Sequence, residues 1–348
     1  MLEYDFLVVG QGLAGTLLTY FLQQENKKVF VISNNNENNS SEVAAGMFNP
    51  VGGKRMLKTW MAEGLLECVE ETYPKLEKLL DSKFYNKQNI LHTFQDEKEK
   101  IQAEKRLNDE DVSKYISLNN EQNENLKTEY GALNVIGGGW VNTKILLRSF
   151  RKYLKENNSY LEEDFNYSEL IYKENKWNYK NYSFDKVVFC EGYKATNNPF
   201  FNKLPFLLSK GEVISFNANN LPKETILKKG IYMVDLGNNT FKSGTTYEWK
   251  DLTEMPTQSG LEKLTTKLDN FLNVEYTIKE HWAGVRPTVS DKKPILGEHN
   301  QNKGIYIFNG LGTKGVMLSP YFANQMKDYL VYAKDLISEV DVNRFYKQ

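Results

Sequence analysis

Apolar residues near the start of the chain fall in runs that predict a strand, a helix and a second strand. Residues 6–9 and 29–32 are continuously apolar, which is typical of strands buried on both faces of a sheet. Between these runs, apolar residues at positions 17, 18, 21 and 22 recur at the spacing of one helix face. Residues 4–33 are therefore interpreted as a βαβ unit.

The same patterns predict further helices and strands along the rest of the chain. Amphipathic spacing predicts helices near 57–80, 97–107, 257–272 and 315–333, and another that begins at about Thr143. Apolar or alternating runs predict strands at 89–94, 187–190, 281–287 and 304–310, with several more over 207–247. The mixture predicts an α/β fold.

A buried strand followed by glycine occurs near residues 10, 190 and 310, which are far apart in the chain. We expect these segments to assemble one Rossmann-type domain, a parallel sheet with helices, from residues 1–56, 140–200 and 283–348. The antiparallel-looking strands in 57–139 and 201–282 would form a second, substrate-binding domain with an antiparallel sheet.

Composition narrows the class of protein only a little. The 348 residues are 40% hydrophobic and 26% charged, which is ordinary for a globular protein with a core. A net charge of −1 offers no bulk attraction for nucleic acid, so a nucleic-acid partner is not expected. No apolar run is long enough to cross a bilayer, no signal segment precedes the first strand, and the two cysteines fit reduced core thiols. These features predict a cytoplasmic protein.

The turn after the first strand carries Gly10, Gly12 and Gly15 in GxGxxG spacing. The first glycine permits the tight turn, the second lets the backbone approach a pyrophosphate, and the third lets the helix pack on the strand. The N-terminus of that helix then offers free N–H groups to phosphate. An acid normally ends the second strand and accepts the ribose hydroxyls, but Ser33 and Asn34 stand there, so we expect these neutral groups to bind the ribose.

Two further segments favour a flavin over a nicotinamide cofactor. In SSEVAAGMFNP, the small residues 44–46 would let the chain lie flat against a large planar group. In FNGLGTKGVMLSP, Gly310, Gly312 and Gly315 stand between an apolar strand and a helix, which gives a second helix N-terminus for negative charge. A nicotinamide enzyme needs one such terminus, whereas an FAD enzyme needs a second for the charge that reduction places on the flavin.

The motifs GQGLAG, SSEVAAGM, FDKVVFCEG, HWAGVRPTVSDKKPILG and GLGTKGVMLSP resemble, in order and approximate spacing, those of the D-amino-acid-oxidase-like flavoproteins. The glycine oxidase and sarcosine oxidase branch is the most similar. The resemblance implies that the Rossmann-type domain binds FAD. It also implies that FAD contacts, besides the glycines, Ser33 and Asn34, the residues Leu13, Ala14, Ser41, Ala45, Gly46, Met47, Tyr167, Gly192, Thr313, Lys314 and Val316.

Four residues match substrate-site or reaction-site positions of that branch. The resemblance implies that Tyr232 and Arg286 bind a substrate carboxylate, that Lys314 adds charge near the flavin edge, and that Lys242 promotes the reaction with oxygen. Arg286 also lies in an apolar strand, where an unpaired charge is costly, so the residues themselves favour a ligand there. Strand alternation predicts that Lys242, Gly244 and Thr246 share one face.

The predicted function is FAD-dependent oxidation of an amino acid or secondary amine that bears a carboxylate. A neutral amine can pass hydride to flavin N5 without a catalytic triad, and the imine product is hydrolysed. The partners would be the small-molecule amine and oxygen or another electron acceptor. No nucleophile-and-base set is evident and the three histidines are scattered, so a hydrolase or a metal site is not supported.

Two alternatives remain open from the sequence. GGGWVNTKILL and LPFLLSKGEVISF also resemble the oxidase half of an enzyme that acts on a carboxymethylaminomethyl-uridine of tRNA. A flavin-binding module without catalysis is the other alternative.

Overall fold

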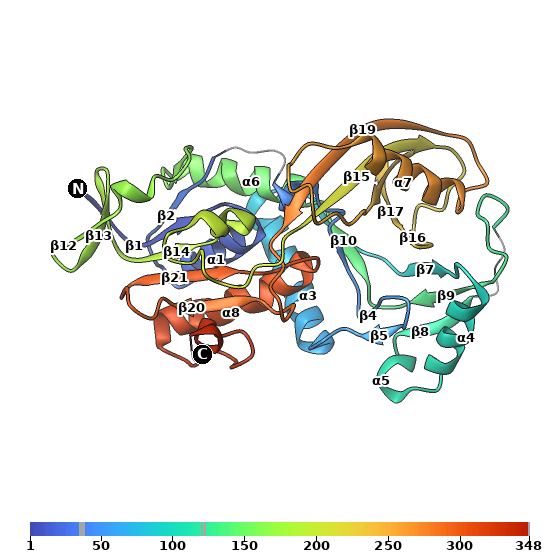
Figure 1. Ribbon diagram of the computed structural model, residues 1–348, viewed down its shortest axis with the longest axis horizontal. Helices are drawn as coiled ribbons and strands as arrows, with labels where there is room; N and C mark the ends of the chain where they lie inside the picture. The colour runs from blue at the N-terminus through green and yellow to red at the C-terminus, as the bar shows by residue number, and fades with distance from the viewer. Residues whose placement is uncertain (35–38, 120, 122, 347–348) are drawn as a thin grey trace.

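Two eight-stranded sheets form the two lobes of the computed structural model, which describes residues 1–34, 39–119, 121 and 123–346 (Figure 1). The first sheet has the order β11-β2-β1-β14-β13-β12, and β21 pairs with both β14 and β20. Its central pairs, β2 with β1, β1 with β14 and β14 with β21, are parallel. The strands are β1 (Leu2–Val9), β2 (Val29–Ile32), β11 (Tyr160–Leu161), β12 (Ile171–Lys173), β13 (Lys176–Tyr179), β14 (Tyr182–Phe189), β20 (Ile295–Glu298) and β21 (Ile305–Asn309).

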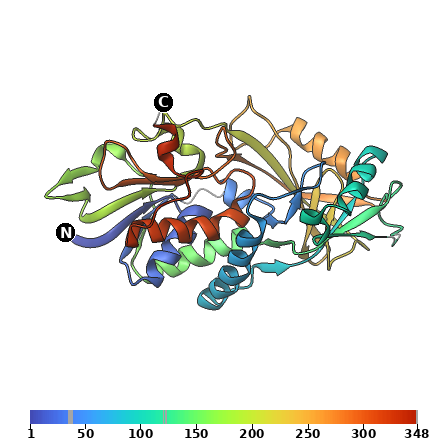
Figure 2. The same ribbon diagram turned by 90° about the horizontal axis from the view of Figure 1, so that it is seen from below.

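The strands of this sheet are apolar on both faces, so each face packs against a core. Helices cover one of the two faces. Phe6 and Val8 of β1 face a core shared with the helices, whereas Leu7 and Val9 face a second core on the opposite side. Figure 2 shows these helices gathered on the side of the lobe opposite the C-terminus. They are α1 (Leu13–Gln24), α3 (Ala62–Leu80), α6 (Thr143–Glu156) and α8 (Gly315–Tyr332).

The second sheet has the order β19-β15-β18-β17-β16-β7-β9-β8 and is antiparallel except for the pair of β16 with β7. One of its faces packs on α7 (Gln258–Asp269), through Leu264 and Leu268. Near β8 and β9 it carries α4 (Glu97–Arg106) and α5 (Glu110–Ser113). The strands are β7 (Ile90–Thr93), β8 (Ile116–Asn119), β9 (Ala132–Val135), β15 (Ser209–Ala218), β16 (Ile226–Lys228), β17 (Tyr232–Gly237), β18 (Thr240–Gly244) and β19 (Tyr276–Arg286).

Short elements complete the fold. A three-stranded sheet has the order β3-β10-β6, and β4 pairs with β5. These elements are α2 (Ser40–Val43), β3 (Met47–Phe48), β4 (Val51–Gly52), β5 (Leu57–Lys58), β6 (Tyr85–Lys87), β10 (Gly139–Val141), and the 3-10 helices η1 (Tyr167–Glu169), η2 (Gly192–Asn197) and η3 (Val342–Phe345).

The predicted α/β fold, with a largely parallel sheet and a separate antiparallel sheet, is confirmed. The position of one helix differs from the expectation: α3 lies in the span 57–139 assigned to the substrate domain, yet it packs on α8 and α6 in the core of the first lobe. The apolar face of α3 includes Leu65, Val69 and Tyr73. Its spacing predicts a helix but does not indicate which sheet or helix that face packs against. Strand β19 also runs across the expected boundary at residues 282–283. The domain limits themselves stay a prediction.

No helix in the described part of the chain combines the length and the apolar character that a bilayer span requires.

We expect Gly15→Ala to destabilise the protein, because a Cβ there would lie 1.9 Å from the carbonyl oxygen of Gly10 and would push α1 off β1. Overpacking of this kind costs about 3 kcal/mol, which lowers the midpoint of thermal unfolding of a chain of this length by roughly 4 °C. Helix propensity alone predicts the opposite sign, since Ala is favoured over Gly in a helix by about 1 kcal/mol.

The matched control is Gly12→Ala, whose Cβ would lie 3.1 Å from the Ser41 Oγ, a side-chain atom that can rotate away. Circular dichroism melting should place this control much closer to the wild type than Gly15→Ala. A Gly15→Ala midpoint equal to or above the wild type would contradict the close contact.

Candidate active site

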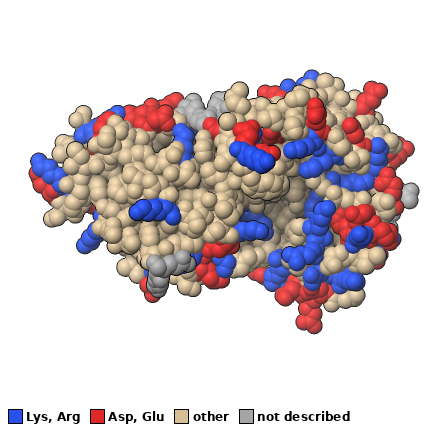
Figure 3. Space-filling model, in the orientation of Figure 1, with Lys and Arg blue, Asp and Glu red and all other residues tan. Residues whose placement is uncertain are grey.

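A cavity of about 1320 Å³ is lined by residues from both lobes. Sites for one small ligand usually measure about 300–1,000 Å³, so this cavity has room for a dinucleotide together with a substrate. Figure 3 shows the surface hollowed in the right-hand half of the view, with Lys and Arg side chains at several points around the hollow.

Two helix N-termini meet at the cavity. Gly12 precedes α1 and Lys314 precedes α8, and neither of these residues caps its helix with its own side chain, whereas Asn142 and Thr257 cap α6 and α7. In α1 the Leu13 backbone N–H donates to the Ser41 hydroxyl at 3.2 Å. The two helices pack against each other, so their positive ends lie on the same wall. Uncapped N–H groups at the end of a helix form a ready site for phosphate or for a developing negative charge.

The carboxyl ends of β2 and β14 line another part of the cavity. The Asn34 side-chain amide donates to Asp164 Oδ1 at 2.7 Å, and both residues line the cavity. The acid that is missing after β2 is therefore present nearby in space, supplied by the segment that follows β11. Sequence reasoning missed Asp164 because it is 130 residues away from Asn34 along the chain.

A buried carboxyl group lies at the end of β14. The hydroxyl of Tyr167 donates to Glu191 Oε1 at 2.5 Å, and the amide of Asn198 donates to Glu191 Oε2 at 2.7 Å. Burial raises the pKa of Glu191 to about 7, and it raises the pKa of Tyr167 as well. Tyr167 and Gly192 line the cavity as predicted, and Glu191 is an additional lining residue that the sequence did not single out.

Most of the residues that the sequence assigned to the cofactor line this one cavity. Gly15 and Gly310 do not: Gly15 touches the backbone of Gly10, and a Cβ on Gly310 would meet the Val289 side chain at 2.7 Å. These two glycines serve backbone packing. Lining residues are Gly10, Gly12, Leu13, Ala14, Ser33, Asn34, Ser41, Ala45, Gly46, Met47, Tyr167, Gly192, Gly312, Thr313, Lys314, Gly315 and Val316.

Arg286 lies at the end of β19 and lines the cavity. Its Nη2 donates to the Thr245 Oγ1 at 2.6 Å and to the Thr246 carbonyl at 3.2 Å, and its guanidinium lies 4.6 Å from the ring centroid of Tyr247. Burial lowers the pKa of Arg286. Among the described residues, none forms a carboxylate ion pair with this guanidinium, so its charge is left available to a ligand.

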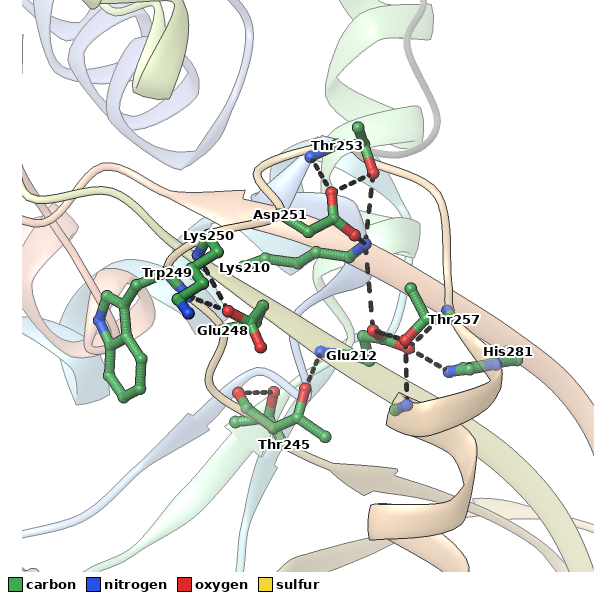
Figure 4. Close-up of polar contacts among 12 residues, drawn as sticks. Lys210, Glu212, Thr245, Glu248, Trp249, Lys250, Asp251, Thr253, Thr257 and His281 are labelled. Atoms are coloured by element: carbon green, nitrogen blue, oxygen red, sulfur yellow. Dashed lines mark hydrogen bonds and ion pairs between the residues drawn. The ribbon is translucent and has the colours of Figure 1, made fainter.

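A polar network holds the loop that carries Thr245 and Tyr247 (Figure 4). The ammonium of Lys210, which is fully buried, donates to Asp251 Oδ2 at 2.6 Å. The carboxylate of Glu212 accepts from the Thr257 hydroxyl at 2.8 Å and lies 2.8 Å from His281 Nε2. Both anchoring residues come from β15, next to β19, so the network fixes the loop over Arg286.

Tyr232 lies on β17 and also lines the cavity, with its hydroxyl oxygen accepting from the Asn49 side-chain amide at 3.2 Å. Because that bond uses the oxygen as acceptor, the hydroxyl proton remains able to donate to a ligand. Burial raises the pKa of Tyr232 to about 12, so it stays protonated. The Lys314 ammonium lies at the α8 N-terminus and donates to the Thr59 Oγ1 at 3.1 Å.

Lys242 does not line the cavity, in contrast to the expectation for its strand face. Its ammonium donates to the Ala44 carbonyl at 2.7 Å, behind the flat segment of small residues, and burial lowers its pKa to about 8. The expected alternation also ends early: β18 stops at Gly244, and Thr245 rather than Thr246 lines the cavity. The hydroxyl of Thr246 instead accepts from the backbone N–H of Glu212 at 2.9 Å.

The residues present fit FAD. The helix end at α1 can take the pyrophosphate, and the helix end at α8 can face the charge that a reduced flavin carries. Residues 44–46 line the cavity and carry no large side chain, so they leave a flat surface that ends at Met47.

Comparison with known proteins agrees with this geometry. Residues 5–329 match the family described as FAD dependent oxidoreductase, DAO. Glycine oxidase of Bacillus subtilis (strain 168) is 29% identical over 139 residues, which span 38% of this chain and 38% of that enzyme's length. The crystal structure of glycine oxidase from Geobacillus kaustophilus superposes with a TM-score of 0.80 over 99% of both chains at 17% identity.

The structure of iminodiacetate oxidase (IdaA) from Chelativorans sp. BNC1 superposes with a TM-score of 0.77 at 18% identity, over 97% of this chain and 98% of that chain. At these identities the two structural likenesses show the fold. The family match, in contrast, covers nearly the whole chain, and the cavity carries both of the helix ends that the cofactor needs. The chain belongs to the DAO family of FAD dependent oxidoreductases, with FAD as its cofactor.

Proposed function

We propose that the protein oxidises an amino acid or secondary amine that bears a carboxylate, with Arg286 as the carboxylate anchor. The observation that carries this proposal is the guanidinium of Arg286, which faces the cavity without a carboxylate partner among the described residues. Leaving a cation desolvated is costly, and a substrate carboxylate offsets that cost through a two-pronged hydrogen bond. The glycine oxidase relative supports the same chemical class.

The surroundings of Arg286 orient its planar group. Gly211 lies on the neighbouring strand β15, and a Cβ there would overlap the guanidinium at 1.7 Å, so glycine leaves the space that the Arg286 side chain occupies. Thr245 and the Tyr247 ring fix the guanidinium from the loop side. Tyr232 donates a further hydrogen bond to the bound carboxylate in this proposal. When bound, FAD would supply the hydride acceptor for oxidation of the carbon next to the amine nitrogen, and water would hydrolyse the imine product.

The direct test is anaerobic bleaching of the flavin absorbance by a panel of amines. We expect glycine, sarcosine and related carboxylate-bearing amines to bleach the flavin, and glycinamide, which lacks the carboxylate, to do so far more slowly. Failure of every free amine in a fully flavin-loaded preparation would contradict the proposal. The tRNA substrate or the non-catalytic flavin module would then be the better explanation.

We expect Arg286→Ala to weaken binding of a carboxylate-bearing amine by about two orders of magnitude, because a hydrogen bond between charged groups contributes up to about 3 kcal/mol. The measurement is the amine concentration that gives half-maximal bleaching rate. Arg286→Lys keeps the charge without the planar fork, so its loss should be smaller. If glycine and glycinamide lose affinity equally in Arg286→Ala, the anchor lies elsewhere.

Oxygen as the electron acceptor forms a second part of the proposal, and it rests on Lys242, whose ammonium does not itself line the cavity but bonds the carbonyl of Ala44, a residue that does. A fixed positive charge close to the site of electron transfer stabilises superoxide as it forms. We expect Lys242→Met to slow reoxidation of the reduced enzyme by oxygen about a hundredfold. Reduction by the amine, followed anaerobically by stopped-flow absorbance, should change far less.

Lys144→Met is the matched control for Lys242. The Lys144 ammonium approaches the same Trp282 ring, at 5.9 Å against 5.5 Å for Lys242, but it does not contact the Ala44 carbonyl. Its reoxidation rate should match the wild type. Equal rates in wild type and Lys242→Met would leave Lys242 as a packing residue and would favour a dehydrogenase with another acceptor.

A further inference from the structure

A further cation with no carboxylate partner among the described residues lies in the same cavity, on the strand next to Tyr232. Lys228 is the last residue of β16, pairs with Tyr232 across the strands, and is only 8% exposed. Its ammonium lies 5.4 Å from the ring centroid of Tyr232, and it lines the cavity. The carboxylate-binding end of the cavity therefore extends beyond Tyr232 to a further positive charge.

The partner of Lys228 inside the protein is a neutral ring. Lys228 Nζ lies 3.1 Å from His92 Nδ1, and His92 Nε2 lies 3.0 Å from Glu99 Oε1. Burial and the neighbouring ammonium lower the pKa of His92 to about 4, so the imidazole is uncharged at neutral pH. With Nε2 carrying the proton toward Glu99, Nδ1 accepts from Lys228.

This arrangement differs from that of a structural ion pair. Lys210 is an example of a structural ion pair in the described part of the chain, because it is fully buried and its ammonium bonds the carboxylate of Asp251 directly at 2.6 Å. Lys228 has no carboxylate at that distance, because His92 stands between it and Glu99. The ring uses one of the three ammonium protons, so the others remain for a group in the cavity.

We propose that Lys228 binds a second carboxylate of the substrate, so that the preferred amine is a dicarboxylate held between Arg286 and Lys228. This inference rests on the proposed function, since it takes the first carboxylate to lie on Arg286. A carboxylate suits the subsite better than a phosphate dianion, because Glu99 lines the same end of the cavity and its negative charge opposes a second charge on the ligand. His92 and Glu99 are positioning residues for the ammonium.

The test uses unreactive thioether analogues with the flavin-loaded enzyme, so that binding is read without turnover. Methylthioacetate carries one carboxylate, whereas thiodiacetate and its longer homologue 3-(carboxymethylthio)propionate carry two. Dissociation constants come from the change in the flavin absorbance spectrum and from calorimetry. We expect the better dicarboxylate to bind the wild type at least about tenfold more tightly than methylthioacetate, as an added charged hydrogen bond requires.

Lys228→Met should bring the ratio of the two dissociation constants close to one, while methylthioacetate binding and flavin content stay near the wild type. Lys229→Met is the matched control: it removes the same charge one position along, where the ammonium bonds the Lys127 carbonyl at 2.6 Å and does not line the cavity. This control should keep the wild-type preference.

Equal binding of one and two carboxylates by the wild type overturns the inference, even if Lys228→Met does not fold, and leaves the proposed function intact. A dicarboxylate preference that survives Lys228→Met also overturns it. If methylthioacetate does not bind either, by spectrum or by calorimetry, both the proposed function and this inference fail.

Discussion

The contact between Gly15 and Gly10 is the constraint on which the cofactor half of this protein depends. A helix can point its N-terminus at a phosphate only if its first turn lies against the end of the preceding strand, and here the backbones approach too closely for any Cβ. That contact fixes where α1 begins. Since α8 packs along α1, it also fixes where the second helix end lies, and the two helix N-termini face one cavity.

Four cations in the described part of the chain form two groups that serve different purposes. Lys210 and Arg151 bond carboxylates directly, at 2.6 Å and 3.0 Å, and they hold the loop over the site and the α2–α6 contact. Arg286 and Lys228 bond neutral groups instead, so their charge is oriented without being neutralised. Both cations of the second group line the cavity. The protein keeps them charged in a poorly solvated place, which is favourable only when an anion completes the site.

The end of the cavity next to β2 shows how a carboxylate that is missing from a motif can be supplied by another segment. Family members normally end the second strand with an acid, and this chain has Ser33 and Asn34. The fold brings Asp164 to within 2.7 Å of the Asn34 amide, and Glu163 lines the cavity beside it. A carboxylate can therefore lie next to the end of the second strand even when the motif residue at that position is neutral.

The sequence by itself determined the main elements and the two helix ends at the cavity, because each of these depends on residues close together in the chain. Apolar periodicity located β1, α1, β14 and α8, and the glycine spacing at 10–15 and 310–315 identified the two helix ends. Only the tertiary structure decided which lobe α3 joins, that Lys242 lies behind the Ala44 carbonyl, and that Thr245 reaches Arg286. It also decided the contact of Lys228 with His92, which are 136 residues apart. Contacts of this kind depend on which strands become neighbours in a sheet, and local patterns of side chains do not encode that order.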